Sequence, residues 1–123
     1  MEFDELSNRV LGCALTVHRE LGPGLLESTY EQCLAYELGQ AGIAFKLQHP
    51  LPVHYRGVLL ECGYRIDLLV EERLILELKS VEALLNIHFA QVLTYMKLSG
   101  IKTGLLINFN VPQLKSGIKR FVL

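Results

Sequence analysis

Residues 64–79, with the sequence YRIDLLVEERLILELK, read as two apolar, strand-like runs joined by a short charged turn. If residues 71–73 form the turn, the two runs pair as a hairpin in which Val70 lies opposite Leu74. Charged side chains interrupt both runs at positions where core residues would otherwise be expected. This hairpin is therefore the expected centre of the fold.

The same register places Asp67 opposite Glu77, and the alternation of side chains places Lys79 on the face of Glu77. Carboxylates directly opposite one another on a sheet repel. A hard divalent cation such as Mg²⁺ or Mn²⁺ would turn this repulsion into coordination, with the backbone C=O of Leu78 as a further ligand. Lys79 could then orient or deprotonate a water molecule and offset the charge on a phosphate under attack. The pattern predicts a metal site for phosphate chemistry.

The spacing from Asp67 to Glu77-x-Lys79 resembles the core motif of the PD-(D/E)xK nuclease superfamily. Three further motifs follow the expected order along the chain: Gly24-x-x-Glu27-x-x-Tyr30, Gln91-x-x-x-Tyr95 and Asn108-Phe109. With them the chain closely resembles the small GxxExxY family, a nuclease-like group. The resemblance runs from about Val17 to Arg120 and implies a restriction-endonuclease-like core.

The resemblance also implies roles for residues outside the hairpin. In related nucleases a glutamate on the first helix reaches the metal site, so Glu27 joins the expected catalytic set of Asp67, Glu77 and Lys79. From its spacing alone, the position of Glu27 in a first helical turn favours interaction with the helix dipole or a capping role. In RecB-like nucleases a Gln-x-x-x-Tyr pair faces the active site or the DNA backbone.

That likeness gives Gln91 and Tyr95 a substrate-positioning role, although their spacing also suits an ordinary half-exposed helix face. Tyr30 lies one turn after Glu27 and could hydrogen-bond the site. An aromatic residue at helical spacing is, however, more often part of a core. His18 has no partner at metal-ligand spacing and is interpreted as structural.

The length of 123 residues predicts one domain, residues 1–123, and an apolar content of 50% argues against disorder. No apolar run approaches the ~18 residues needed to span a bilayer, so we expect a cytoplasmic protein that does not bind membranes. Cys13, Cys33 and Cys62 are odd in number and lack C-x-x-C spacing, which predicts buried thiols in a reducing compartment.

The charge is unevenly distributed although the net charge is only −1. Of the 12 Lys and Arg residues, six lie in residues 79–123, where Glu82 is the single acid among the chain's 13. We expect this carboxy-terminal part to face phosphate, with a solvated lysine surface as the alternative.

Periodicity and turn residues predict the remaining elements. The expected helices run from about Phe3 to Leu21, from Leu25 to Gln40 burying Leu26, Tyr30, Leu34 and Leu38, and from Ile87 to Leu98 between an Asn86 cap and Gly100. The expected strands are Ala44 to Gln48, followed by two prolines that suggest an edge or a bend, a hairpin turning at Arg56-Gly57, a long strand from Leu59 to Val70, a buried strand over Lys102 to Phe109, and an edge strand within Lys115 to Leu123. The predicted class is α/β, with a mixed central β-sheet flanked by helices.

Three functions fit these features. The first is a Mg²⁺- or Mn²⁺-dependent nuclease hydrolysing phosphodiester bonds of DNA or RNA. The second is a catalytically silent nucleic-acid- or protein-binding module with the same fold, because 123 residues leave little room for a DNA clamp unless a homodimer supplies it. The third is a metal-free ion network, in which Lys79 and Arg65 balance the acids.

Overall fold

The structure, a computed structural model, describes residues 4–123. Its elements in chain order are α1 Glu5–Leu21, α2 Glu27–Gln40, β1 Phe45–Pro50, β2 Val53–Tyr55, β3 Val58–Leu60, β4 Arg65–Val70, β5 Leu74–Lys79, α3 Asn86–Ser99, β6 Thr103–Asn108, the 3₁₀ helix η1 Leu114–Gly117 and β7 Ile118–Val122. Within these residues, five strands form one sheet in the order β1-β4-β5-β6-β7, and β2 pairs with β3 separately. Strands β5 and β6 are parallel, and the other neighbours in the larger sheet are antiparallel. The predicted α/β class with a mixed central sheet is confirmed.

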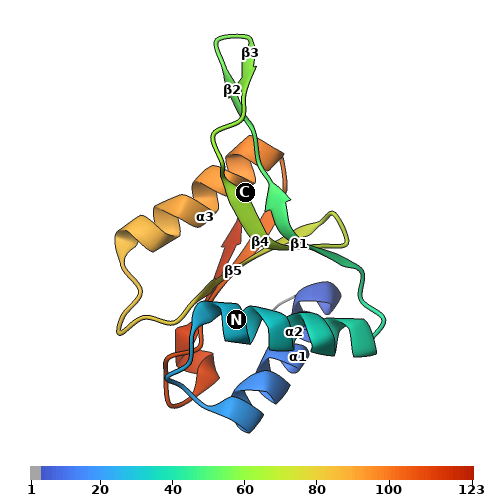
Figure 1. Cartoon of the computed structure of the whole chain (residues 1–123), viewed down its shortest axis with the longest axis vertical. Coiled ribbons are helices and arrows are strands. Elements are labelled where there is room, and N and C mark those ends of the chain that lie inside the picture. Colours follow the sequence, from blue (N-terminus) through green and yellow to red (C-terminus); the bar gives the residue numbers. More distant parts are fainter. Residues whose placement is uncertain (1–3) are drawn as a thin grey trace.

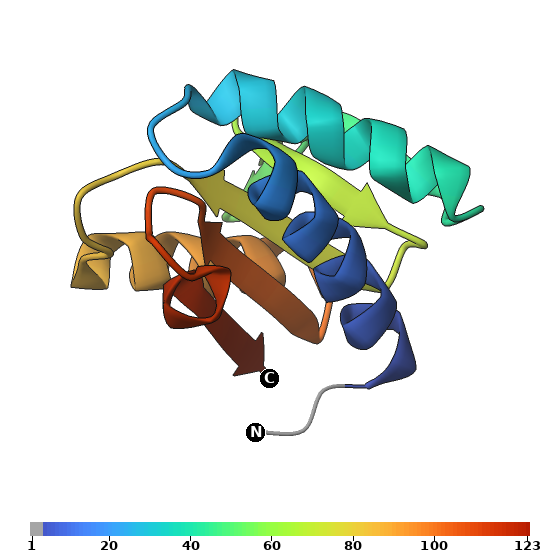
Figure 2. The ribbon, with the colours of Figure 1, turned by 90° about the horizontal axis from the view of Figure 1, so that it is seen from below.

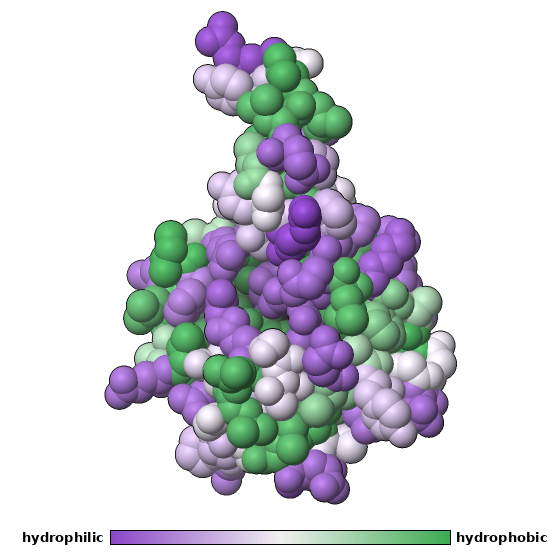
Figure 3. Space-filling model, in the orientation of Figure 1, coloured by the Kyte–Doolittle hydropathy of each residue, from purple (hydrophilic) through white to green (hydrophobic). Residues whose placement is uncertain are grey.

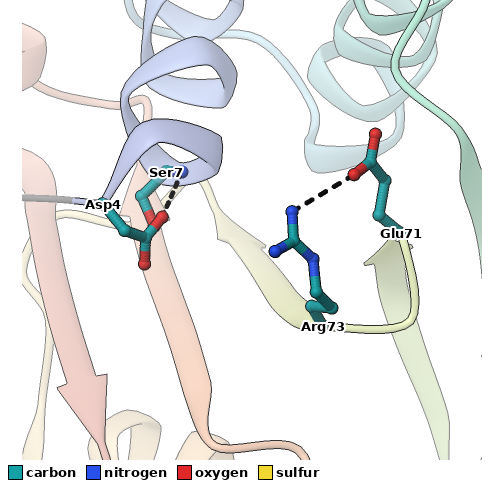
Figure 4. A network of polar contacts seen from close by, with 4 residues as sticks. All are labelled: Asp4, Ser7, Glu71 and Arg73. Atoms are coloured by element: carbon teal, nitrogen blue, oxygen red, sulfur yellow. Dashed lines mark hydrogen bonds and ion pairs between the residues drawn. The ribbon is translucent and has the colours of Figure 1, made fainter.

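The central hairpin has the predicted register. Leu68 pairs with Leu76 and Val70 pairs with Leu74 across the β4–β5 ladder. In the turn, Glu71 and Glu72 adopt left-handed backbone conformations, with φ of 49° and 56°. The guanidinium of Arg73 contacts the Glu71 carboxylate at 3.3 Å (Figure 4).

Helices cover both faces of the sheet (Figures 1 and 2). Helices α1 and α2 pack on one face, against buried side chains that include Leu68, Leu76 and Leu78. Helix α3 packs on the other face, against a second cluster that includes Ile75 and Leu106. The alternating side chains of β5 therefore divide the core into two layers. A charged side chain on this strand must lie in one of these layers, against a face of the sheet.

Helix α1 begins after Asp4, whose carboxylate accepts a hydrogen bond from the Ser7 N–H at 2.7 Å (Figure 4). Such a cap satisfies one of the free N–H groups of a first helical turn. The helix ends at Leu21, where Gly22 has φ of 66°. The predicted helix is confirmed to this residue, and its expected first residue, Phe3, lies outside the described residues.

Helix α2 begins two residues later than expected. Its inward stripe contains Tyr30, Leu34 and Leu38, as predicted. Leu26 is 73% exposed, so the prediction of its burial is wrong. It precedes the helix in an extended conformation, and helical periodicity therefore does not set its direction.

The long strand predicted from Leu59 to Val70 is also wrong. The chain leaves the β2–β3 hairpin at Leu60 and enters the larger sheet at Arg65. Gly63, with φ of 81°, lies in the connection. Figure 1 shows the hairpin projecting from the body, and apolar side chains are visible on it in Figure 3.

The other strands lie close to their predicted places. Strand β1 is an edge strand and ends at Pro50, a position where a missing backbone N–H is tolerated. Strand β7 forms the other edge, as expected for the chain end. Helix α3 includes Asn86 as its first residue, so the predicted cap lies inside the helix, and Gly100 ends it with φ of 75°.

Three further findings concern the expected class of protein. Within the described residues, no helix is both long and apolar enough to cross a bilayer. All three cysteines are free. Cys13 and Cys33 are half-buried, but Cys62 is exposed in the segment between the two sheets, so the prediction of three buried thiols is wrong.

Candidate active site

At the predicted acid pair, hydrogen bonds from backbone to side chain replace the backbone ladder between β4 and β5. Beyond the Leu68–Leu76 pair, the Asp67 N–H donates to Glu77 Oε1 at 3.2 Å, and the Leu78 N–H donates to Asp67 Oδ2 at 2.9 Å. Each carboxylate thus accepts a bond from the backbone of the opposite strand. The two acids meet where backbone pairing ends, in the register that the sequence predicts.

Glu77 is an acid within the sheet, with only 3% of its surface exposed. Burial raises the pKa of its carboxyl to about 9, and the charge of Asp67 adds to this rise, while the charge of Lys79 opposes it. Desolvation of this size disfavours the ionised form unless a cation lies nearby. A positive ligand beside Glu77 would therefore be strongly favoured.

Asp67 is half-buried and opens toward α2. It lines an acidic cavity of about 240 Å³, whose other lining residues are Glu27, Ser28, Glu31, Gln48 and Leu78. The Gln48 amide donates one hydrogen bond to Glu31 and another to Asp67 Oδ1 at 3.3 Å. Burial raises the pKa of the Glu31 carboxyl. The hydrogen bond from Gln48 opposes this rise, and the charge of Asp67 adds to it.

Gln48 and Glu31 are site residues that sequence reasoning missed. The β1–β4 ladder pairs Leu47 with Leu68 and His49 with Ile66, but it skips the intervening pair of Gln48 and Asp67. Gln48 has φ of 49° in the middle of a strand, a conformation that costs a non-glycine residue about 1–2 kcal/mol. The one sequence signal is that Glu31 follows Glu27 by four residues and so shares its helix face.

Glu27 lies in the first turn of α2, as predicted. Its Oε2 accepts a hydrogen bond from the Ser80 N–H at 3.3 Å, and the Ser80 hydroxyl donates to Leu25 O at 2.6 Å. The start of α2 is thereby joined to the chain that follows β5. Glu27 shares the acidic cavity with Asp67, so the structure brings these two predicted residues together.

Lys79 ends β5 and is half-buried. Within residues 4–123, no carboxylate lies within salt-bridge distance of its ammonium. Its backbone is fixed from β6, because Lys79 O accepts a hydrogen bond from the Phe109 N–H at 2.9 Å. The buried Asn108 side chain holds the following loop through bonds to both N and O of Val81, at 3.1 and 3.0 Å.

Tyr30, for which a substrate-positioning role is expected, lies in the core and contacts the loop before α2. Its ring is fully buried and stacks on Phe109, with 4.5 Å between ring centroids. Its hydroxyl donates to Gly22 O at 2.6 Å and accepts from the Leu25 N–H at 3.2 Å. Tyr30 therefore holds the loop before α2, which in turn carries Glu27.

Gln91 and Tyr95 lie on the α3 side of the sheet. The Gln91 amide donates to the Tyr95 hydroxyl at 3.1 Å. Burial raises the pKa of the Tyr95 hydroxyl. The hydrogen bond from Gln91 opposes this rise, and the charges of Glu77 and Asp67 add to it. The Tyr95 hydroxyl thus lies within the electrostatic reach of both acids.

The donor set fits a hard divalent cation with few protein ligands. Within the described chain, no three His, Cys, Asp or Glu side chains are grouped closely enough to hold a metal ion. Two carboxyl groups, those of Asp67 and Glu77, are nevertheless present, and burial together with the charge of Asp67 disfavours ionisation of Glu77 in the absence of a cation. Mg²⁺ usually keeps several waters and takes only one or two carboxylates from the protein. Two carboxyl groups with room for water therefore suit Mg²⁺ better than they suit an ion that needs all its ligands from side chains.

Comparison with known proteins gives one family. The model of the PD-(D/E)XK nuclease superfamily matches residues 4–121, which is nearly the whole chain. Neither a curated protein nor a solved structure matches the chain.

Proposed function

The chain belongs to the PD-(D/E)XK nuclease superfamily, and we propose that it hydrolyses phosphodiester bonds of nucleic acid with Mg²⁺ or Mn²⁺ as cofactor. The observation that carries this proposal is the acid pair at the parting of β4 and β5. The sheet brings Asp67 against a buried Glu77, an arrangement that is costly without a cation. A bound metal ion would remove this cost, and metal binding at the acid pair would therefore be favoured.

Each predicted residue has a role in this proposal. Asp67 and Glu77 would hold the ion, with the C=O of Leu78 as a further ligand. When bound, the ion supplies Lewis-acid chemistry to the attacking water and to the phosphate. Lys79, at the end of the same strand, would donate a hydrogen bond from its ammonium to the oxygen that gains charge or, as the neutral amine, accept the proton of the attacking water.

The supporting residues fix this geometry from two helices and strand β1. Glu27 holds the Ser80 backbone, which follows Lys79 directly. Gln48 holds Asp67 from β1. On the α3 side, Gln91 and Tyr95 position the scissile backbone. Residues that fix a ligand's orientation commonly change metal affinity or activity about 10- to 100-fold when they are removed.

The finer assignments are also proposals. Gly24, Glu27 and Tyr30 support placing the chain in the GxxExxY group, and the continuous sheet supports one nuclease-like domain over residues 1–123. Three free thiols suit the reducing cytoplasm. A homodimer would add binding surface to so short a chain.

A cleavage assay tests the function. The purified protein is incubated with single-stranded and duplex DNA and RNA, in Mg²⁺, in Mn²⁺ and in EDTA, beside Asp67→Asn, Lys79→Met and the surface control Glu20→Gln. We expect metal-dependent cleavage by the parent and by Glu20→Gln, and none by the other two variants. Cleavage that persists in EDTA, or in Asp67→Asn, would show that this site does not perform the reaction.

The silent binding module remains the second candidate, and the projecting β2–β3 hairpin is the observation that favours it. Its apolar side chains Tyr55, Val58 and Leu59 are each more than half exposed. Exposed apolar surface of this kind commonly marks an interaction site. Metal binding without cleavage of any tested nucleic acid would favour this function.

A further inference from the structure

A groove runs along α3 beside the stem of the projecting hairpin. Its volume is about 560 Å³, and its lining residues are Val53, Tyr64, Ile87, His88, Ala90, Gln91, Thr94, Tyr95 and Leu98. This volume lies within the usual range of small-ligand sites, about 300–1,000 Å³. Figure 1 shows the hairpin rising from the sheet at the end of α3, so the groove has walls from two separate parts of the chain.

One wall of this α3 groove presents an aromatic ring to solvent. Tyr64 is 45% exposed, and its ring meets that of Tyr95 edge-on, with 6.0 Å between centroids. Ile87, which is 69% exposed, and Val53 add aliphatic surface. A flat apolar ligand can therefore stack on Tyr64 without displacing any core side chain.

The α3 wall also carries hydrogen-bonding groups. His88 Nδ1 accepts a bond from the Leu85 N–H at 2.9 Å, so the neutral ring carries its proton on Nε2, which is a donor. Gln91 and Thr94 follow on the same helix face. An aliphatic side chain of a protein partner would leave these groups without hydrogen bonds at a cost, whereas a flat ligand with a polar edge would satisfy them.

Tyr95 connects the groove to the two strands that carry the candidate active site. This residue lines the groove and also packs in the buried cluster on the α3 face of the sheet, together with Ile66 of β4 and Ile75 of β5. A ligand in the groove is therefore adjacent to the place where a phosphate would be held. The ligand and that phosphate would belong to one molecule, because a nucleotide joins a flat base with a polar edge to a phosphodiester.

We infer that the α3 groove receives a nucleobase of single-stranded nucleic acid, stacked on Tyr64, next to the phosphodiester held at the acid pair. This inference rests on the proposed nuclease function and names its substrate class. A base within a duplex has its faces stacked and its edge paired, so it cannot enter such a groove without being extruded. Stacking on an aromatic side chain accepts any base, and it is worth about 1–3 kcal/mol per base.

The test measures affinity for fluorescent single-stranded and duplex oligonucleotides by anisotropy. Ca²⁺ replaces Mg²⁺, and gels verify that the oligonucleotides stay intact. The variants are Tyr64→Ala, Tyr64→Phe and the control Tyr36→Ala, which removes a tyrosine that is 64% exposed on α2. We expect Tyr64→Ala to weaken single-strand binding about 5- to 150-fold, and we expect Tyr64→Phe and Tyr36→Ala to bind like the parent. A single abasic residue in the strand should cause a similar loss in the parent and little further loss in Tyr64→Ala.

Three results would overturn the inference. The first is an unchanged single-strand affinity in Tyr64→Ala. The second is an equal loss for duplex and single strand. The third is a parent dimer in sedimentation that dissociates in Tyr64→Ala, because a second copy of the chain would then occupy the groove. If cleavage remains metal-dependent and sensitive to Asp67→Asn, such a failure leaves the nuclease function standing. Base-dependent binding without any cleavage would instead support the groove and count against that function.

Discussion

The Asp67 N–H donates to the Glu77 carboxylate at 3.2 Å, while the carboxylate of Asp67 accepts from the next residue of the Glu77 strand, Leu78, at 2.9 Å. The side chains of these two acids thus make the contacts that backbone carbonyls make elsewhere in the ladder. Both acids are fixed by the sheet itself, and their carboxyl groups lie together where the strands part. The two acids are in place without any ligand, and the cost is that the Glu77 carboxyl is buried beside the charge of Asp67.

That cost should appear in the stability of the metal-free protein. Burial, together with the Asp67 charge, raises the pKa of Glu77 from 4.5 to about 9 in the folded state. A carboxyl with a higher pKa in the folded state stabilises the fold while it is protonated, and this contribution is lost as the pH rises. Unfolding of the EDTA-treated parent by denaturant should therefore require progressively less denaturant between pH 4.5 and about 9.

The variant Glu77→Gln isolates this effect, because its amide oxygen can still accept the Asp67 N–H. At the upper end of that window it should be more stable than the parent, by about 2.7 kcal/mol if only two pKa units are realised. At the lower end the two proteins should converge. If the free energy of unfolding depends on pH in the same way for the parent and Glu77→Gln, burial of the Glu77 carboxyl does not carry the expected cost. Glu20→Gln serves as the control for removing a surface acid.

Lys79→Met should separate chemistry from metal binding. The ammonium lies on the strand face of Glu77 but contributes no metal ligand, so Mn²⁺ affinity should stay within a few-fold of the parent. The cleavage rate should fall at least about 100-fold, the lower range for losing a group that transfers a proton or stabilises charge. Single-turnover cleavage and calorimetry measure the two quantities. A proportional loss of both would mean that Lys79 only maintains the site's structure.

Gln48 offers a test of the contact from β1. Gln48→Ala removes the amide that joins Glu31 to Asp67, and Mn²⁺ affinity should fall about tenfold. Gln48→Gly removes the same amide, but glycine adopts the positive φ without strain. It should therefore bind Mn²⁺ as weakly as Gln48→Ala, while its free energy of unfolding should be about 1 kcal/mol higher than that of Gln48→Ala. If Gln48→Gly binds Mn²⁺ like the parent, backbone strain rather than the amide would explain the effect.

Tyr30→Phe should act through the loop before α2. The variant keeps the stack on Phe109 but leaves Gly22 O and the Leu25 N–H without their hydroxyl partner. We expect a loss of about 1–3 kcal/mol in the free energy of unfolding. Cleavage should also slow, because the Leu25 carbonyl holds Ser80. Tyr36→Phe, on the exposed face of α2, is the matched control and should change neither quantity.

The central hairpin was predictable because local rules determine it. Side-chain alternation and a three-residue turn set the register that places Asp67 across from Glu77. Local rules also gave the helix stops at Gly22 and Gly100. They failed at Leu60, because alternation cannot reveal that the chain moves from one sheet to another.

The rest of the candidate site depends on tertiary contacts. Gln48 carries no motif, and its amide reaches Asp67 only because β1 returns alongside β4. Tyr30 belongs to the motif that contains Glu27, yet Tyr30 is buried and its hydroxyl holds the loop that precedes Glu27. Motif membership thus predicts candidate residues around the site, but only the tertiary contacts show which of them lie beside Asp67.

The most direct test of the account is a calorimetric titration of the purified protein with Mn²⁺, beside Asp67→Asn and Lys79→Met. Asn at position 67 can still accept the Leu78 N–H, so the fold should be retained, and circular dichroism checks this. We expect saturable binding by the parent and by Lys79→Met, and none by Asp67→Asn. Binding of Mn²⁺ by Asp67→Asn with the parent's affinity would contradict the claim that Asp67 and Glu77 form the metal site.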